Sequence, residues 1–437
     1  MDVFNTLSWP RTELVTLSRE FSTAGDRILD STGKMVPSQR VSSGELVFLA
    51  TKVPPLAASR YTVTSGVPPV KGRAIAQSTT LDNGIIRLRV DEKTGGIVEL
   101  TAQGTKGNFA DTSGGESLND YLYLPGDNLK DLQRNGLVTI RVGEKGPLVA
   151  SLIVESAAPG CKKLVRELRV VAGLDYVELT NTVDKERLQA KSYHAKEGKE
   201  SVNFAFPFAV PDGDMLLDIP LGVMRPEADQ MPSACKNWFS VGRWADVSNR
   251  SRGITWVTLD APLVQVGGIT ATLLNSQYDP NVWRQHVEPT QKLYVWAMNN
   301  HWGTNYRAYQ EGPTVFRFVL RPHQRRDTAE ASRFATGFSY PLLAVPAHSE
   351  KPSSTPLLTV EPKDVLVTAL KPSDDGKALI VRLFGASAKA QSARLKWGGV
   401  KPKGVFLSDT SEQSGKSVEG RIEVPPSGLV SLRAELQ

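Results

Sequence analysis

The sequence predicts an all-β protein in which one large β-sandwich is flanked by two smaller β-sandwich domains. Short runs of β-branched and aromatic residues recur between Gly, Pro, Asn and Asp, at roughly the 8–12-residue spacing of sandwiches. The 36 Gly and 28 Pro residues supply the turns that many short strands need. Helical signals are confined to residues 327–338, where a polar start and a late glycine predict one short helix.

Composition shifts divide the chain into three predicted domains. Residues 1–70 form a small sandwich that ends in a Gly- and Pro-rich linker at 65–72. Residues 75–345 form the large domain, whose length exceeds that of a seven-stranded sandwich and favours two large packed sheets. A second linker at 347–356 precedes the last small sandwich, residues 356–437.

The individual strands are predicted from alternation of apolar and polar residues. In the large domain the clearest hairpin pairs Ile85–Val90 with Ile97–Leu100 across a turn at Asp91–Gly96. Further strands are expected at 13–17, 45–49, 137–142, 148–155, 164–171, 176–183, 315–321, 357–360, 378–383 and 430–436.

Composition also excludes several function classes. Apolar content of 40% and charged content of 22% are those of an ordinary soluble globular protein. The formal charge of +6 is spread along the chain, and the basic runs at 162–166 and 325–326 lack interleaved aromatic residues, so no nucleic-acid partner is expected. No apolar run reaches 18 residues, so no membrane span is expected.

The two cysteines, Cys161 and Cys235, match neither a metal spacing nor a disulfide framework. Free thiols are the expectation, with a single bridge as the alternative. Met1 and Asp2 lead directly into a strand pattern, so no secretory leader is expected, and no compartment is indicated.

The densest functional signal lies between Tyr294 and His323. Aromatic rings suit the C–H faces of sugars, while amides and guanidinium groups suit sugar hydroxyls, so this segment predicts a carbohydrate site. The predicted substrate-binding residues there are Trp302, Asn300, Asn305, Tyr306 and Arg307. The alternative is that the tryptophans are sheet core and the asparagines shape a turn by bonding backbone groups.

Six of the eight tryptophans fall between Trp238 and Trp302. Trp244 and Trp256 are predicted to be core residues, whereas Trp238 and Trp302 stand among polar residues and are expected to be exposed.

No catalytic constellation is predicted within the chain. Acid–base hydrolysis of a glycoside needs two carboxyl groups at a defined separation. The acids that stand in polar turns are expected to be caps and surface charges: Asp120, Asp127, Asp246, Asp260 and Glu311. The five histidines are scattered without zinc spacing, and no nucleophilic serine motif or phosphate loop is present, so no catalytic residue, metal or cofactor is expected in this chain. A calcium or sodium site built from turn carbonyls is left open.

The segment 294–323 resembles the end of the large β-domain in the C-terminal half of glycoside hydrolase family 38, the α-mannosidase family. Three further segments resemble the same region in the same order: Val3–Val15, Asn119–Gly126 and Asp364–Leu383. The resemblance covers essentially the whole chain. It implies a galactose-mutarotase-like supersandwich for the large domain.

The same resemblance implies the parts that would complete an enzyme. The family's zinc ligands and nucleophilic aspartate lie in an α/β domain that precedes this region, so zinc is expected in a missing N-terminal catalytic domain. The implied activity is zinc-assisted, retaining hydrolysis of α-mannosides, with no turnover by this chain alone. The implied partners are an α-mannoside-type carbohydrate, the missing catalytic domain and a homo-oligomer. The alternatives are a stand-alone carbohydrate-binding or scaffold protein and, more weakly supported, catalysis within the sandwich itself.

Tyr121 receives a role from the resemblance. In the family, a tyrosine of the corresponding Leu-Pro turn reaches the active site and hydrogen-bonds the sugar. Alternation places Tyr121 and Tyr123 on one face, and the alignment favours Tyr121. The alternative is a phenol held in the core by a backbone hydrogen bond.

Overall fold

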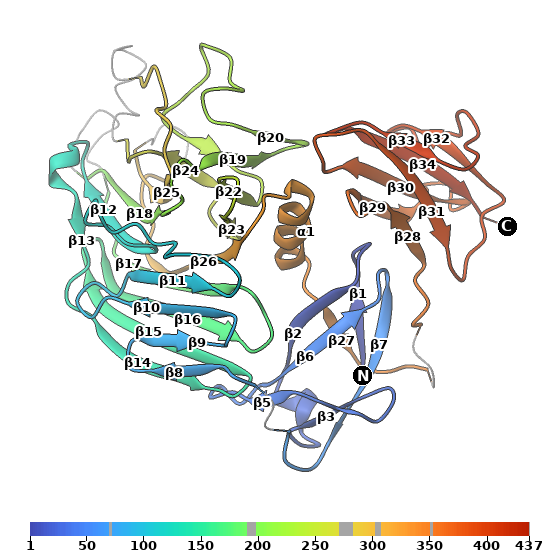
Figure 1. The fold of residues 1–437 in the computed structure, drawn as a ribbon, viewed down its shortest axis with the longest axis horizontal. Coiled ribbons are helices and arrows are strands. Elements are labelled where there is room, and N and C mark those ends of the chain that lie inside the picture. The colour runs from blue at the N-terminus through green and yellow to red at the C-terminus, as the bar shows by residue number, and fades with distance from the viewer. Residues whose placement is uncertain (70–71, 190–197, 271–282, 302–306, 350–352, 437) are drawn as a thin grey trace. The chain divides into compact units, whose positions relative to one another are not determined.

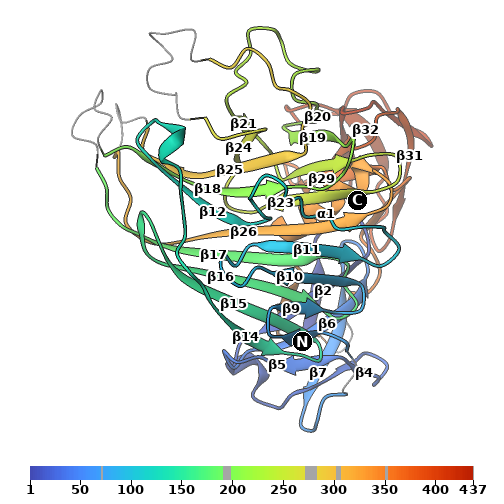
Figure 2. The ribbon, with the colours of Figure 1, turned by 60° about the vertical axis from the view of Figure 1, so that its left-hand side comes forward.

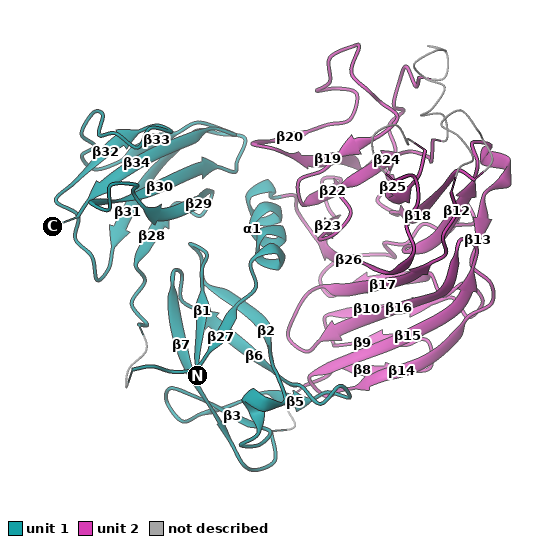
Figure 3. Cartoon of the chain, turned by 180° about the vertical axis from the view of Figure 1, so that it is seen from behind, with its two compact units in different colours: residues 1–71, 327–437 teal, residues 72–326 magenta. Residues whose placement is uncertain are grey.

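The computed structural model describes residues 1–69, 72–189, 198–270, 283–301, 307–349 and 353–436. It divides into two compact units, Met1–Lys71 with Asp327–Gln437, and Gly72–Arg326 (Figure 3). Strands dominate both units, which confirms the predicted all-β class (Figure 1).

The unit of residues 72–326 is built on a large antiparallel sheet. Its described strands run in the order β14 (Thr139–Lys145), β15 (Val149–Ala158), β16 (Cys161–Val171), β17 (Val177–Lys185), β26 (Gly312–His323), β23 (Gly253–Thr258), β22 (Trp244–Ser248), β19 (Asp214–Ile219) and β20 (Gly222–Met224). Figure 2 shows β14 to β17 and β26 lying side by side. Alternation is clear on β17, where every second residue from Val177 to Lys185 is buried.

A second sheet packs over this one to form the core. Its described order is β13 (Gln133–Arg134), β12 (Asp120–Pro125), β18 (Glu200–Pro207), β25 (Lys292–Asn299), β24 (Leu263–Val266) and β21 (Phe239–Ser240). Phe204 and Phe206 of β18 face Phe318 of β26, with ring centroids 5.7 and 5.3 Å apart. Trp256 of β23 lies 5.7 Å from Phe206 and is fully buried. These edge and tilted contacts close a two-sheet sandwich.

A smaller described sheet completes the unit, in the order β11 (Ile97–Ala102), β10 (Ile86–Val90), β9 (Thr80–Asp82) and β8 (Ile75–Gln77). β10 and β11 form the predicted hairpin, with Leu88 opposite Leu100. Trp244 and Trp256 are buried, as predicted for core residues.

The other unit contains two large described cores and a smaller cluster formed by Ala329, Leu366 and Ala386. The N-terminal core lies between two sheets. One sheet has the described strand order β27 (Leu343–Val345), β1 (Asp2–Asn5), β7 (Ala57–Thr64), β3 (Arg27–Asp30) and β4 (Met35–Val36). The other has the described order β2 (Arg11–Leu17), β6 (Leu46–Val53) and β5 (Ser38–Arg40). The C-terminal core lies between β28 (Leu358–Glu361), β31 (Gln391–Trp397) and β33 (Ile422–Val424), and β29 (Val365–Pro372), β30 (Ala378–Gly385), β34 (Leu429–Glu435) and β32 (Gly404–Ser408).

The predicted helix is α1 (Thr328–Ser339), capped by Asp327, whose carboxylate accepts from the Glu330 amide at 3.0 Å. At its other end, buried Arg11 donates to the carbonyls of Gly337 (2.8 Å) and Tyr340 (2.6 Å). The helix is therefore tied to the N-terminal strands.

The domain division differs from the prediction at one end of the large domain. That domain was expected to span 75–345, whereas the unit ends at Arg326. Residues 327–345 cluster with the N-terminal segment because β27 pairs with β1, Asp2 opposite Val345, and because Arg11 caps α1. Pairing between residues so distant in sequence leaves no local signal in composition.

Candidate functional site

A cavity of about 330 Å³ opens in the unit of residues 72–326, where strands of both large sheets end. It is lined by apolar side chains of Leu263, Trp296 and Met298, and by polar ones of Lys185, Glu200, Asn299, Arg307, Tyr309 and Gln310. An apolar surface with a few fixed polar groups is the usual make-up of a small-ligand site. We refer to it as the Glu200 cavity.

The Glu200 cavity contains a buried ion pair. Lys185 Nζ lies 2.7 Å from Glu200 Oε1, and the two side chains are only 2% and 4% exposed. Tyr123 donates its hydroxyl to Glu200 Oε2 at 2.8 Å. Because Lys185 ends β17 and Glu200 begins β18, the pair joins the two sheets. Burial raises the pKa of Glu200, while hydrogen bonds from Lys185 and Tyr123 oppose that shift.

Gly160 makes room for the Tyr123 ring. Its φ is +75°, and a Cβ there would lie 2.3 Å from the ring. A side chain at position 160 would therefore displace the phenol from Glu200.

The structure separates Tyr121 from Tyr123. Tyr121 is fully buried and donates its hydroxyl to the Pro159 carbonyl at 2.7 Å, which is the core arrangement left open by the sequence. Burial raises the pKa of Tyr121. Of the two tyrosines, Tyr123 contacts Glu200, which lines the cavity, while Tyr123 itself is buried, with 6% of its surface exposed.

Asn300 lies at the cavity, but its amide is already engaged. Its Oδ1 accepts from the Glu200 amide at 2.6 Å, and its Nδ2 donates to the carbonyls of Gly198 (2.7 Å) and Leu188 (3.3 Å). It therefore holds the start of β18 in place, as the turn-shaping alternative expected. Neighbouring Asn299 is exposed at the cavity edge.

Arg307 is exposed at the cavity, with its guanidinium carbon 5.3 Å from the centre of the Tyr309 ring. Arg187 lies over the same ring at 3.7 Å. Trp302, Asn305 and Tyr306 lie outside the described residues, and their roles stay predictions.

Behind the cavity lies an aromatic cluster. Trp296 is 5.9 Å from both Trp238 and His301, and Trp238 is 5.6 Å from Trp283. Trp238, which the sequence predicted to be exposed, is half-buried. His301 is 1% exposed, and neither ring nitrogen has a hydrogen-bond partner in the described part of the chain. Burial, aided by the positive charge of Lys199, lowers the pKa of His301 to about 4, and Asp127 opposes this.

Two of the acids expected at turns or on the surface are buried instead. Asp120 accepts from the Ser117 amide and hydroxyl at 2.8 and 2.9 Å, and burial raises its pKa. Asp246, 2% exposed, lies 2.8 Å from His323 Nε2 and accepts from Arg326 Nε at 3.1 Å. Both carboxylates begin or lie within buried strands, where Asp120 is satisfied by the nearby Ser117 and Asp246 by partners distant in sequence.

The sequence also missed Asp218 as a perturbed acid. Burial raises its pKa to about 6, although the Arg243 amide donates to it at 2.7 Å. Within the described ranges, no three His, Cys, Asp or Glu side chains are grouped so that they could hold a metal ion. Cys161 and Cys235 are free thiols, as expected. No helix among the described residues is long and apolar enough to cross a membrane.

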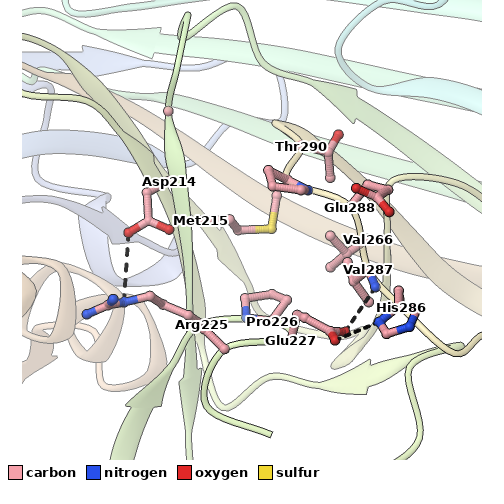
Figure 4. Close-up of a pocket in the computed structure, with 13 residues that line it drawn as sticks. Asp214, Met215, Arg225, Pro226, Glu227, Val266, His286, Val287, Glu288 and Thr290 are labelled. Atoms are coloured by element: carbon pink, nitrogen blue, oxygen red, sulfur yellow. Dashed lines mark hydrogen bonds and ion pairs between the residues drawn. The ribbon is translucent and has the colours of Figure 1, made fainter.

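A second cavity, of about 390 Å³, lies in the same unit (Figure 4). Met215, Val266 and Val287 line its middle. Glu227 accepts from the Val287 amide at 3.0 Å and contacts His286 Nδ1 at 3.1 Å, so both its oxygens tie neighbouring loops together. Asp214 is shared between Arg225 (3.9 Å) and Arg326 (3.0 Å). None of the described substrate-binding candidates, Tyr121, Asn300 and Arg307, lines this cavity, so it is the weaker candidate.

Lys185 and Glu200 were not predicted from the sequence. The alternation along β17 could have indicated that Lys185 is buried. Lys185 occupies the next inward position after Val177, Leu179, Asn181 and Val183. A charged residue in an apolar register indicates a buried partner.

Two models of one protein family match this chain. The family model of the glycosyl hydrolases family 38 C-terminal domain matches residues 81–262, and that of the family 38 C-terminal beta sandwich domain matches residues 364–434. The sandwich fold and these two ranges define the C-terminal β-region of a glycosyl hydrolase. The chain belongs to glycosyl hydrolase family 38.

Two solved structures support the fold. An α-mannosidase from Enterococcus faecalis V583 aligns over 99% of this chain and 56% of its own, with a TM-score of 0.71 and 15% identity. A protein described as in glycosyl hydrolase family 38, also from E. faecalis, aligns over 99% and 58%, with a TM-score of 0.71 and 14% identity. The chain thus spans less than two thirds of their length. A galactose mutarotase-like protein from Lactobacillus casei aligns over 56% of this chain, with a TM-score of 0.34 and 11% identity. A search of curated protein sequences found no match.

Proposed function

We propose that this chain is the carbohydrate-binding β-region of a family 38 α-mannosidase and that it forms one wall of the sugar cleft. The observation that carries the proposal is the Glu200 cavity, in which Asn299, Arg307 and Gln310 surround an apolar wall. Family membership and the alignment with an α-mannosidase along the whole chain support it.

In this proposal the chain binds and orients the sugar, and the bond-breaking chemistry belongs to a catalytic domain. That domain would carry zinc and the nucleophilic aspartate of a retaining hydrolysis. The alignment with only 56% of the α-mannosidase chain is consistent with such a division of labour. The catalytic domain and a second copy of this chain are the proposed protein partners.

Mannose and methyl α-mannoside are expected to bind this chain weakly, with a Kd of about 1 mM, because only one wall of the cleft is present. Trp296 lines the cavity, so tryptophan fluorescence should report the titration. Loss of one hydrogen bond, worth about 1 kcal/mol, should weaken binding roughly fivefold in each of Asn299→Ala and Arg307→Ala.

The exposed Arg87 on β10, outside the cavity, provides the control, and Arg87→Ala should bind as the wild type does. Trp302→Ala should also bind less tightly if its ring stacks on the sugar. An unfolded or strongly destabilised Trp302→Ala variant would instead make Trp302 a core residue. If all variants bound mannose as tightly as the wild type, the sugar would not bind in this cavity and the proposal would be contradicted.

The chain alone is expected not to hydrolyse aryl α-mannosides, with or without added zinc. Release of the aryl group is measured by absorbance after repeated purification. Turnover that persists and is lost on replacing an acid of this chain, such as Asp218→Asn, would place catalysis within the sandwich and contradict the proposed division of labour.

A further inference from the structure

Two guanidinium groups converge on one tyrosine at the Glu200 cavity. Arg187 lies 3.7 Å and Arg307 lies 5.3 Å from the centre of the Tyr309 ring. Arginine that stacks on a ring still presents its N–H donors at the edge of the guanidinium plane. Tyr309 thus holds two cations in place while their donors stay available.

Neither arginine is neutralised within the described part of the chain. The one hydrogen bond described for the Arg187 side chain goes to the neutral Gln189 at 3.1 Å, and no ion pair between described residues involves Arg307. Both side chains are exposed. Because both guanidinium carbons lie close to one ring centre, they are at most about 9 Å apart and repel each other, and an anion that contacts both would reduce that repulsion.

The other charges at the cavity are already paired. Glu200 is held by Lys185 at 2.7 Å. Asp260 accepts from Arg317 Nε at 2.9 Å and Arg317 Nη2 at 2.8 Å, a two-point contact that occupies both its oxygens. Among the described residues that line the cavity, Arg307 is therefore the charged side chain without a described ion-pair partner.

We infer that Arg187 and Arg307 form a subsite for an oxyanion substituent, phosphate or carboxylate, on the carbohydrate that the Glu200 cavity takes. This inference rests on the proposed function, since Arg307 and Tyr309 line the same cavity that would hold the sugar ring. Planar guanidinium donors match the geometry of phosphate and carboxylate oxygens. The preferred ligand is thus an acidic sugar, and a neutral mannoside is the weaker one.

The test compares four ligands by tryptophan fluorescence and calorimetry: mannose, mannose 6-phosphate, mannuronic acid and inorganic phosphate. Mannose 6-phosphate should bind wild-type protein at least about tenfold more tightly than mannose, the size expected for one charge-assisted hydrogen bond. Raising the salt concentration should weaken the phosphosugar but not mannose. Mannuronic acid shows whether a carboxylate serves as well as a phosphate.

Arg187→Gln combined with Arg307→Gln should abolish the tenfold preference, while the affinity for mannose falls only by the roughly fivefold loss expected from Arg307 alone. Arg87→Gln, which removes one exposed positive charge elsewhere in the same unit, should keep the preference.

Each other outcome overturns the inference. If mannose binds and the phosphosugar binds no better, the anion subsite fails and the proposed function stands. If inorganic phosphate binds as tightly as the phosphosugar, the anion site is not linked to a sugar. If no sugar binds, the proposed function fails as well.

Discussion

Replacing Lys185 with methionine is expected to lower the free energy of unfolding by about 3–5 kcal/mol, the cost of removing one partner of a buried ion pair. The Glu200 carboxylate would keep only the Tyr123 hydroxyl as a described side-chain donor, at 2.8 Å. An uncompensated buried charge is far more costly than a lost surface contact. Urea unfolding followed by tryptophan fluorescence measures the change, read from the transition of the unit of residues 72–326.

Two variants isolate the cause of this loss. Lys185→Met with Glu200→Gln should recover most of it, because glutamine still accepts from Tyr123 and carries no charge. Lys163→Met breaks a lysine–glutamate pair on β16, 3.0 Å from Glu155, in which the lysine is 54% exposed, and should cost at most about 1 kcal/mol. Equal losses at positions 163 and 185 would contradict a buried pair.

Acidification is expected to destabilise the unit of residues 72–326 through His301. Its pKa is about 4 in the folded chain, below the ordinary value of 6.5, so the unfolded state takes up a proton first as pH falls. The stability that neutral His301 contributes is fully present above pH 6.5 and is lost as pH falls to 4. The difference between the two pKa values corresponds to about 3 kcal/mol.

His301→Phe keeps a ring beside Trp296 and removes the titrating group. Between pH 7 and pH 4, the free energy of unfolding should fall by about 3 kcal/mol less in this variant than in the wild type. The exposed His348 serves as the control, and His348→Phe should retain the wild-type slope. If the free energy of unfolding fell equally with pH in the wild type and in His301→Phe, charged His301 would have to hydrogen-bond an acceptor or water in the folded chain.

Much of the fold could be predicted because alternation is a local property of the chain. Alternation of apolar and polar residues predicted the strands β10 and β26, and the turn residues between β10 and β11 predicted their hairpin. The helix α1 was predicted from its polar start at Asp327. The end of the large domain was predicted at 345 and lies at 326, since β27 pairs with β1 from the other end of the chain. Strand pairing over such separations depends on the whole fold, which composition does not record.

The candidate site was predicted in part. The segment before β26 was predicted to bind carbohydrate from its density of aromatic and amide side chains, and Arg307 of that segment lines the Glu200 cavity. The amide of Asn300 and the phenol of Tyr121 are instead engaged by backbone groups. Residue type alone does not distinguish a free amide from one that holds a turn, because both uses need the same donors and acceptors.

The sequence by itself therefore determined the class of fold, a minority of the strands, the helix α1 and the membership of family 38, because these depend on local pattern and on several matching segments in order. Only the tertiary structure decided which polar groups meet. Lys185 and Glu200 are joined across two sheets, and Arg187 and Arg307 each lie over the ring of Tyr309. Burial then sets the energy of each such group, and burial is a property of the packed sheets as a whole.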